Sequence, residues 1–132
     1  MKAVIVDDSQ LMREHLVEML ALFSNIELAE MAEDAQRAIE VIRATKPDLV
    51  ILDIRLSIGS GIDVLEAIKK DNQCPVVIIY TNYPFPQYKK KCTDLGAEFF
   101  FDKSTESQLM IKTIESIANR YHSSNQKGKR EG

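Results

Sequence analysis

Cysteine and glycine are rare in this sequence, and long hydrophobic runs are absent. The cysteines Cys74 and Cys92 have neither CxxC spacing nor the cysteine and histidine neighbours of a zinc site, so both are expected to be buried or inert thiols. Residues 1–8 form a short apolar stretch that ends in acids, unlike a signal peptide or a membrane span. The lack of a targeting segment predicts a cytoplasmic protein.

Positive charge is also scarce. The 132 residues carry a net charge of −3, whereas a nucleic-acid-binding face needs a surplus of basic side chains. A hydrophobic content of 45% with 28% charged residues is typical of a folded, water-soluble chain, and the length suits one domain. We therefore expect no direct binding of nucleic acid or membrane by this domain.

Short apolar runs alternate with amphipathic stretches along the chain. The apolar runs predict strands at residues 3–6, 26–31, 49–52, 76–80 and 99–101. The third and fourth runs are so uniformly apolar that we expect both faces of these strands to be covered. Helical spacing of apolar residues predicts helices around residues 12–23, 38–42, 61–68, 87–95 and 104–121. This alternation predicts an α/β fold with a parallel sheet.

The last ten letters of the sequence, SSNQKGKREG, differ in character from the rest. They contain nothing that could bury a core. Residues 1–122 are therefore predicted to form the domain, and residues 123–132 a disordered tail or a truncated linker.

Polar side chains follow the predicted strands at the edge where parallel sheets bind ligands. Asp7 and Asp8 follow the first strand, Asp53 the third, Thr81 the fourth and Lys103 the fifth. Three carboxylates brought together repel one another, and Mg²⁺ with the ammonium of Lys103 would balance them. Mg²⁺ and lysine can also hold the oxygens of a phosphoryl group that Asp53 attacks in line, with a hydrogen bond from Thr81.

These motifs resemble the response-regulator receiver domain of two-component signalling, the CheY-like family. The resemblance rests on Val-Asp-Asp, Leu-Asp-Ile, the threonine after the fourth strand and Gly-Ala-Glu-Phe-Phe-Phe-Asp-Lys, and it spans residues 1–121. It implies a flavodoxin-like (βα)5 fold with a doubly wound parallel sheet of order 2-1-3-4-5. It also implies a signalling switch that catalyses only its own phosphoryl transfer and dephosphorylation.

The resemblance assigns a role to the carboxylates. Asp53 becomes the phosphoacceptor, and it shares an Mg²⁺ ion with Asp7, Asp8 and the backbone carbonyl of Arg55. The implied phosphoryl donor is a histidine kinase or a histidine phosphotransfer protein.

The resemblance also names the residues that respond to the phosphate. Thr81 and Lys103 bind it, and Phe100, three residues before the lysine, is the aromatic that switches with Thr81. The shift is expected to reach the surface of the last two helices, where an unknown downstream protein or effector domain would bind. Receivers often form homodimers through these helices, so self-association is a further expectation.

Several positions depart from the family pattern. Ser57 stands where a proline is usual, which leaves the loop after the acceptor less restricted. Ser104 replaces the proline that usually follows the lysine, and it is expected to cap the last helix. Asn82 and Tyr83 crowd the pocket beside the threonine. This crowding predicts restricted access of water and a long-lived acyl phosphate, with Arg55 and Tyr83 nearest the hydrolytic path.

The sequence also allows other interpretations of function. A receiver-like module that binds its partner regardless of phosphate is suggested by the unusual Asn82-Tyr83-Pro84 segment. A flavin or nucleotide binder fits less well, because Asp-Asp-Ser stands where a glycine-rich loop would hold a phosphate. Phe100 suits a packing role as well as a switch role. The chain could act alone or as the amino-terminal piece of a longer regulator.

Overall fold

The chain alternates five strands with five helices in a computed structural model that describes residues 1–131, with side chains described through Tyr121. The elements are β1 (Lys2–Val6), α1 (Gln10–Leu20), β2 (Glu27–Ala32), α2 (Ala35–Thr45), β3 (Leu49–Leu52), α3 (Gly61–Ile68), β4 (Val76–Thr81), α4 (Pro86–Asp94), β5 (Phe99–Asp102) and α5 (Ser107–Glu131). Strand bounds lie within one residue of those expected from the apolar runs. Among the described residues, no helix combines the length and apolar character needed to cross a bilayer.

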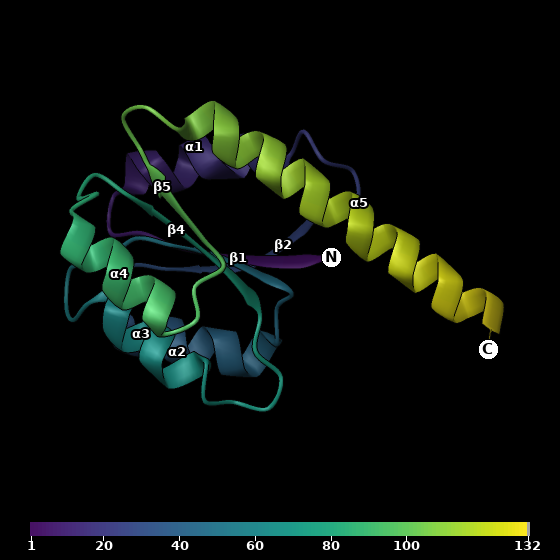
Figure 1. Cartoon of the computed structure of the whole chain (residues 1–132), viewed down its shortest axis with the longest axis horizontal. Helices are drawn as coiled ribbons and strands as arrows, with labels where there is room; N and C mark the ends of the chain where they lie inside the picture. Colours follow the sequence, from purple (N-terminus) through teal and green to yellow (C-terminus); the bar gives the residue numbers. More distant parts are fainter. Residues whose placement is uncertain (132) are drawn as a thin grey trace.

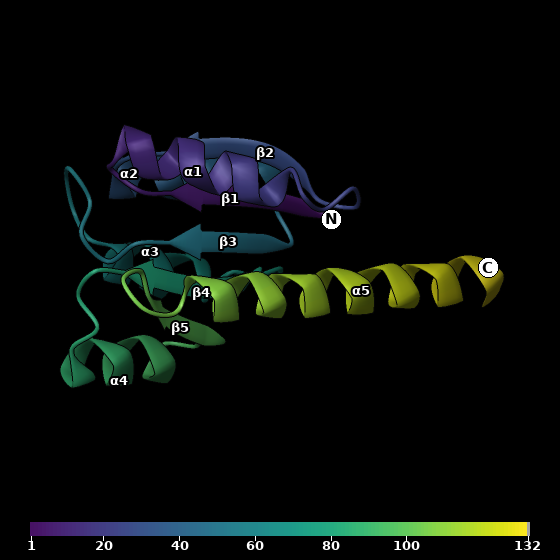
Figure 2. The ribbon, with the colours of Figure 1, turned by 90° about the horizontal axis from the view of Figure 1, so that it is seen from above.

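The strands form a single parallel sheet in the order β2-β1-β3-β4-β5. This order confirms the predicted flavodoxin-like fold. The arrowheads of β1 and β3 point toward the same edge of the sheet (Figure 2), so the residues that follow these strands lie side by side. The functional side chains predicted at the strand ends are therefore brought to one edge.

Helices cover both faces of the sheet (Figure 1), with α2, α3 and α4 on one side and α1 and α5 on the other. All of β3 is buried, and its side chains alternate between the two layers: Val50 packs toward α2 and α3, and Ile51 toward α1 and α5. This two-sided burial explains why β3 and β4 lack the polar alternation of a half-exposed strand.

Three helices begin directly at the carboxyl edge of the sheet with a polar cap. Side-chain oxygens of Ser9, Asp34 and Ser60 accept backbone N–H groups in the first turns of α1, α2 and α3. Helix α4 lacks a side-chain cap, and Pro86 occupies its first turn instead. The caps fix where the loops that carry the polar residues end.

Helix α5 differs from its prediction at both ends. It begins at Ser107, and Ser104 does not cap it, because the Ser104 hydroxyl donates to Asp102 Oδ1 at 2.7 Å within the preceding turn. The backbone is helical to Glu131, beyond the end expected at residue 121. The disordered tail or truncated linker from residue 123 stays a prediction. The helix projects past the sheet (Figure 1). Gly132 lies outside the described residues, and the domain boundary at residue 122 stays a prediction.

Candidate functional site

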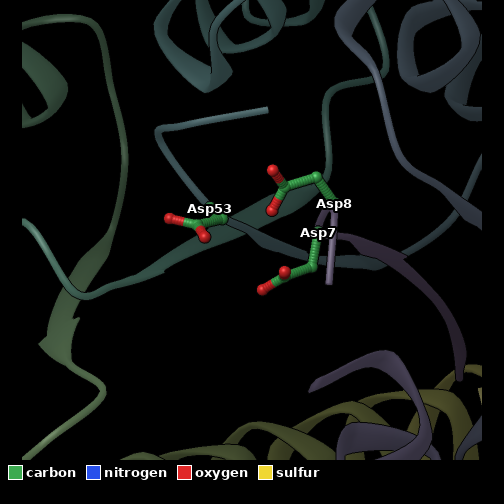
Figure 3. Close-up of side chains that lie close together, drawn as sticks. All are labelled: Asp7, Asp8 and Asp53. Atoms are coloured by element: carbon green, nitrogen blue, oxygen red, sulfur yellow. The ribbon is translucent and has the colours of Figure 1, made fainter. Parts of the chain in front are cut away.

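Three carboxylates gather where β1 and β3 end (Figure 3). Asp7, Asp8 and Asp53 each offer one oxygen, and these oxygens lie within 4.8 Å of one another. Strand pairing brings them together: Val6 lies opposite Leu52, and the backbone N–H of Asp53 donates to the Val6 carbonyl at 2.9 Å. Asp7 and Asp53 are buried, whereas Asp8 is exposed.

Lys103, the residue directly after β5, joins this cluster. Its Nζ donates to Asp7 Oδ2 at 2.6 Å and to Asp53 Oδ2 at 2.8 Å, and the lysine side chain is only 5% exposed. The backbone places it there, because the Lys103 N–H donates to the carbonyl of Thr81, the last residue of the neighbouring strand β4, at 2.9 Å. The structure thus collects side chains that are far apart in the sequence.

Burial and hydrogen bonding oppose each other in setting the charges of this cluster. Burial raises the pKa of Asp7, and the hydrogen bond from Lys103 offsets only part of that rise. Burial alone would lower the pKa of Lys103, but the bonds to Asp53 and Asp7 outweigh it and leave the pKa above its usual value. Lys103 therefore stays an ammonium, a single positive charge bonded to two of the three carboxylates.

The residues present fit a divalent cation. Carboxylate oxygens are the ligands that Mg²⁺ prefers, and one lysine does not balance three carboxylates. Asp8 points its carboxylate toward those of the other two residues (Figure 3), and no hydrogen bond from the described residues holds it. The cluster therefore has the charge and the free ligand for a hard metal ion.

Thr81 and Phe100 lie next to the carboxylates rather than among them. Thr81 is fully buried at the end of β4, and its hydroxyl oxygen accepts the backbone N–H of Tyr83 at 3.1 Å. Phe100 is half-buried, pairs with Ile79 and packs toward α2, α3 and α4. Its neighbours Phe99 and Phe101 stack on the opposite face of the sheet, with ring centroids 6.1 Å apart.

Arg55 and Tyr83 pair across the loops that follow β3 and β4. The guanidinium carbon of Arg55 lies 4.1 Å from the centroid of the Tyr83 ring, which is cation–π geometry. The Arg55 backbone also forms an isolated bridge with Ser60. The sequence placed both side chains near the hydrolytic path, but it did not reveal their mutual contact.

The close approach of two backbones explains why residue 61 is a glycine. A Cβ atom on Gly61 would lie 2.0 Å from the carbonyl oxygen of Asp53, and the Gly61 N–H donates to the Ile54 carbonyl at 2.7 Å. A side chain at this position would displace the backbone of Asp53.

Ser57 and Arg13 are loop anchors that sequence reasoning missed. Both the N–H and the hydroxyl of Ser57 donate to the Glu33 carbonyl, at 3.3 and 3.0 Å, so the loop expected to be less restricted is tied to the end of β2. A proline could make neither bond. Arg13 Nη1 donates to the backbone carbonyl of Asp7 at 2.7 Å. Its place one helical turn after the cap Ser9 is a signal that could have suggested this contact.

Comparison with known proteins agrees with the fold. The family model of the response regulator receiver domain matches residues 3–115. The DNA-binding transcriptional activator EvgA of Escherichia coli (strain K12) is 34% identical over 122 residues, which cover 92% of this chain and 59% of that protein. A protein-glutamate methylesterase/protein-glutamine glutaminase of Idiomarina loihiensis is 35% identical over 77 residues, 58% of this chain and 20% of that protein. The chain thus spans less than two thirds of these relatives.

A solved receiver-domain structure has the same fold as this chain. The signal receiver domain of the putative response regulator NarL from Mycobacterium tuberculosis superposes with a TM-score of 0.80 at 26% identity, covering 89% of this chain and 95% of that one. The family match, the relatives and the sheet order together show that the chain belongs to the receiver domains of two-component response regulators, which serve in phosphorylation-based signalling.

Proposed function

We propose that this domain is a phosphorylation-controlled switch in which Asp53 accepts a phosphoryl group from a phosphohistidine. The observation that carries the proposal is the buried Lys103 ammonium, bonded to both Asp53 and Asp7 beside the free carboxylate of Asp8. A structural ion pair needs no third carboxylate, whereas a site for Mg²⁺ and phosphate does.

In the proposed step, a carboxylate oxygen of Asp53 attacks phosphorus in line while the phosphorus–nitrogen bond breaks and the histidine nitrogen keeps the electron pair. Bound Mg²⁺, held by Asp7, Asp8, Asp53 and the backbone carbonyl of Arg55, would neutralise charge on the phosphoryl oxygens. Lys103 would exchange its bond to Asp53 for a phosphoryl oxygen.

Thr81 is suited to sense the product. Its hydroxyl oxygen accepts a bond from the Tyr83 N–H, and the hydroxyl hydrogen, which no bond within the described part of the chain uses, can be donated to a phosphoryl oxygen. We expect that donation to shift the loop after β4, and Phe100 with it, and to change the surface of α4 and α5 as a shift between two populated states. The domain would thus be a switch and not a turnover enzyme.

The partners follow from this role. A histidine kinase or histidine phosphotransfer protein would supply the phosphoryl group in the cytoplasm. Because relatives such as EvgA extend well beyond the matched region, we propose that the output passes to an effector domain or a separate protein. The receiver itself would bind neither nucleic acid nor membrane, and self-association would use α4 and α5.

The second candidate is a module that binds its partner regardless of phosphate. The contact between Arg55 and Tyr83 favours it, because this pair links the loops that flank Asp53 and Thr81. Partner binding by Asp53→Asn protein discriminates the two functions: a switch loses the phosphate-dependent increase in affinity, whereas a constitutive module binds as wild type does.

Intact-mass measurement after incubation with Mg²⁺ and acetyl phosphate tests the first proposal. We expect a gain of one phosphoryl group in wild type, none when EDTA removes Mg²⁺, and none in Asp53→Asn, which keeps the shape of the side chain. Asp63→Asn is the matched control, because Asp63 is an exposed carboxylate in the first turn of α3. No gain in folded wild-type protein would reject the proposal.

A further inference from the structure

Arg13 is a charged residue beside the metal-binding loop for which the proposed step has no use. Its side chain is only 17% exposed, and its Nη1 donates to the backbone carbonyl of Asp7 at 2.7 Å. Ordering a long arginine side chain costs rotamer entropy. The hydrogen bond of this ordered side chain goes to the backbone of the loop that carries Asp7 and Asp8.

The carbonyl that Arg13 binds belongs to the peptide between Asp7 and Asp8. Asp7 is also held by its N–H, which donates to the Ala32 carbonyl at 3.0 Å, and by its Oδ1, which accepts the Ser9 N–H at 2.9 Å. The Asp8 carboxylate has no such bond from the described residues. Because no bond from the described part of the chain orients the Asp8 carboxylate, its direction depends on the Asp8 backbone. The peptide that leads into that backbone is the one that Arg13 restrains.

Arg13 reaches this peptide from a fixed base. Its own N–H donates to the Ser9 carbonyl at 2.9 Å in the first turn of α1, and Ser9 Oγ accepts the Met12 N–H at 3.2 Å. The guanidinium also lies 4.0 Å from Glu33 Oε2, in the loop after β2. The loop that carries Asp7 and Asp8 is thus connected to both α1 and the end of β2.

We propose that Arg13 is a positioning residue that holds Asp8 in the orientation needed to bind Mg²⁺. This inference rests on the proposed function and names a residue that supports its metal site. Groups that orient metal ligands typically change metal affinity by about 10- to 100-fold when they are removed.

Charge repulsion alone predicts the opposite change in Mg²⁺ affinity when Arg13 is removed. A guanidinium repels Mg²⁺, so its removal would strengthen binding if charge alone mattered. Glu33 lies beside the Arg13 guanidinium and is 61% exposed, so the repulsion is partly neutralised and further screened by solvent and salt. The orienting effect therefore dominates, and the sign of the change distinguishes the two explanations.

Titration of the metal-free protein with Mg²⁺, followed by ¹H–¹⁵N NMR, measures the affinity. We expect Arg13→Met to weaken Mg²⁺ binding by about tenfold. Arg37→Met is the matched control: Arg37 lines the same surface hollow as Arg13 and Glu33, is 57% exposed, and bonds no carbonyl of the metal loop. The control should bind Mg²⁺ as wild type does. Equal or tighter binding by folded Arg13→Met would overturn the proposal.

A second measurement needs no metal. The backbone order parameter of the Asp8 amide in the metal-free protein should fall in Arg13→Met and not in Arg37→Met. An unchanged order parameter would show that Arg13 does not hold the loop. If Arg13→Met fails to fold, Arg13→Gln replaces it: this polar side chain is shorter and uncharged and cannot replace the Nη1 bond to the Asp7 carbonyl, so weaker Mg²⁺ binding than wild type is expected and equal binding overturns the proposal.

These outcomes separate the two proposals. Wild-type protein that binds no Mg²⁺ and takes up no phosphoryl group defeats the proposed function. The order parameter of Asp8 still reports whether Arg13 restrains the loop.

Discussion

Replacement of Tyr83 by alanine should shorten the lifetime of the phosphorylated domain. Arg55 lies two residues after Asp53, and Tyr83 lies two residues after Thr81, on loops that follow the neighbouring strands β3 and β4. The guanidinium of Arg55, 4.1 Å from the ring centroid of Tyr83, therefore links the two loops beside the acceptor. We predict that water reaches the acyl phosphate more readily when this link is absent.

The geometry of the pair sets the size of the effect. Arg55 is exposed and Tyr83 is half-buried, so the contact belongs to the weaker class of cation–π interactions, about 0.5–1 kcal/mol. Loss of that stabilisation raises the ratio of separated to paired loops by a factor of about 2 to 5. If hydrolysis proceeds only from the separated state, the rate follows the fraction of molecules in that state and should rise by up to this factor.

The assay is the loss of phosphoryl mass over time, after the phosphodonor has been removed and with Mg²⁺ present. Tyr83→Phe keeps the ring over Arg55 and should decay as wild type does. Tyr88→Ala is a second control, which removes another aromatic side chain from the segment after β4. The Tyr88 ring centroid lies 5.8 Å from that of Phe85, and its removal should also leave the rate unchanged. A Tyr83→Ala rate no faster than wild type would refute the reasoning.

Three other predictions concern stability and reactivity. Gly61→Ala should lower the free energy of unfolding by about 1–3 kcal/mol in urea melts, because the alanine Cβ would overlap the Asp53 carbonyl. An unchanged unfolding midpoint would show that the backbone accommodates the Cβ without a clash. Ser57→Pro should lose more stability than Ser57→Ala, because it removes both bonds to Glu33, each contributing about 0.5–1.5 kcal/mol; the reverse order would mean that loop entropy dominates. Cys74 is exposed, contrary to the expectation that both cysteines are buried or inert, and it should react with iodoacetamide at pH 8. Buried Cys92 should not react, because burial raises its pKa to about 11. The fraction of Cys92 present as thiolate rises only as the pH approaches that value. Equal alkylation of both cysteines would show that solvent and reagent reach Cys92.

The strand-end residues could be predicted because topology alone brings them together. Parallel strands end at a common edge, so Asp7 and Asp53 meet although they lie far apart in the sequence. The alternation of a strand likewise separates Phe100 from Phe99 and Phe101. These inferences need only the element order and the apolar pattern.

Contacts between loops could not be predicted, since they depend on where flexible side chains reach. The placement of Arg55 over Tyr83 joins the loops after β3 and β4, and the two bonds from Ser57 to the Glu33 carbonyl join the loops after β3 and β2. Ser104 shows the same limit locally: a serine near a helix start suits a cap, but a nearer acceptor, Asp102, takes its hydroxyl hydrogen.

Transfer of the phosphoryl group to Asp53 is tested most directly by locating the modified residue. Borohydride reduction converts an aspartyl phosphate to homoserine, which peptide mass spectrometry then locates in the chain. We predict homoserine at position 53 alone, in protein phosphorylated with Mg²⁺ present. Homoserine at position 7 or 8, or phosphate retained on a residue that borohydride leaves unchanged, would contradict the assignment.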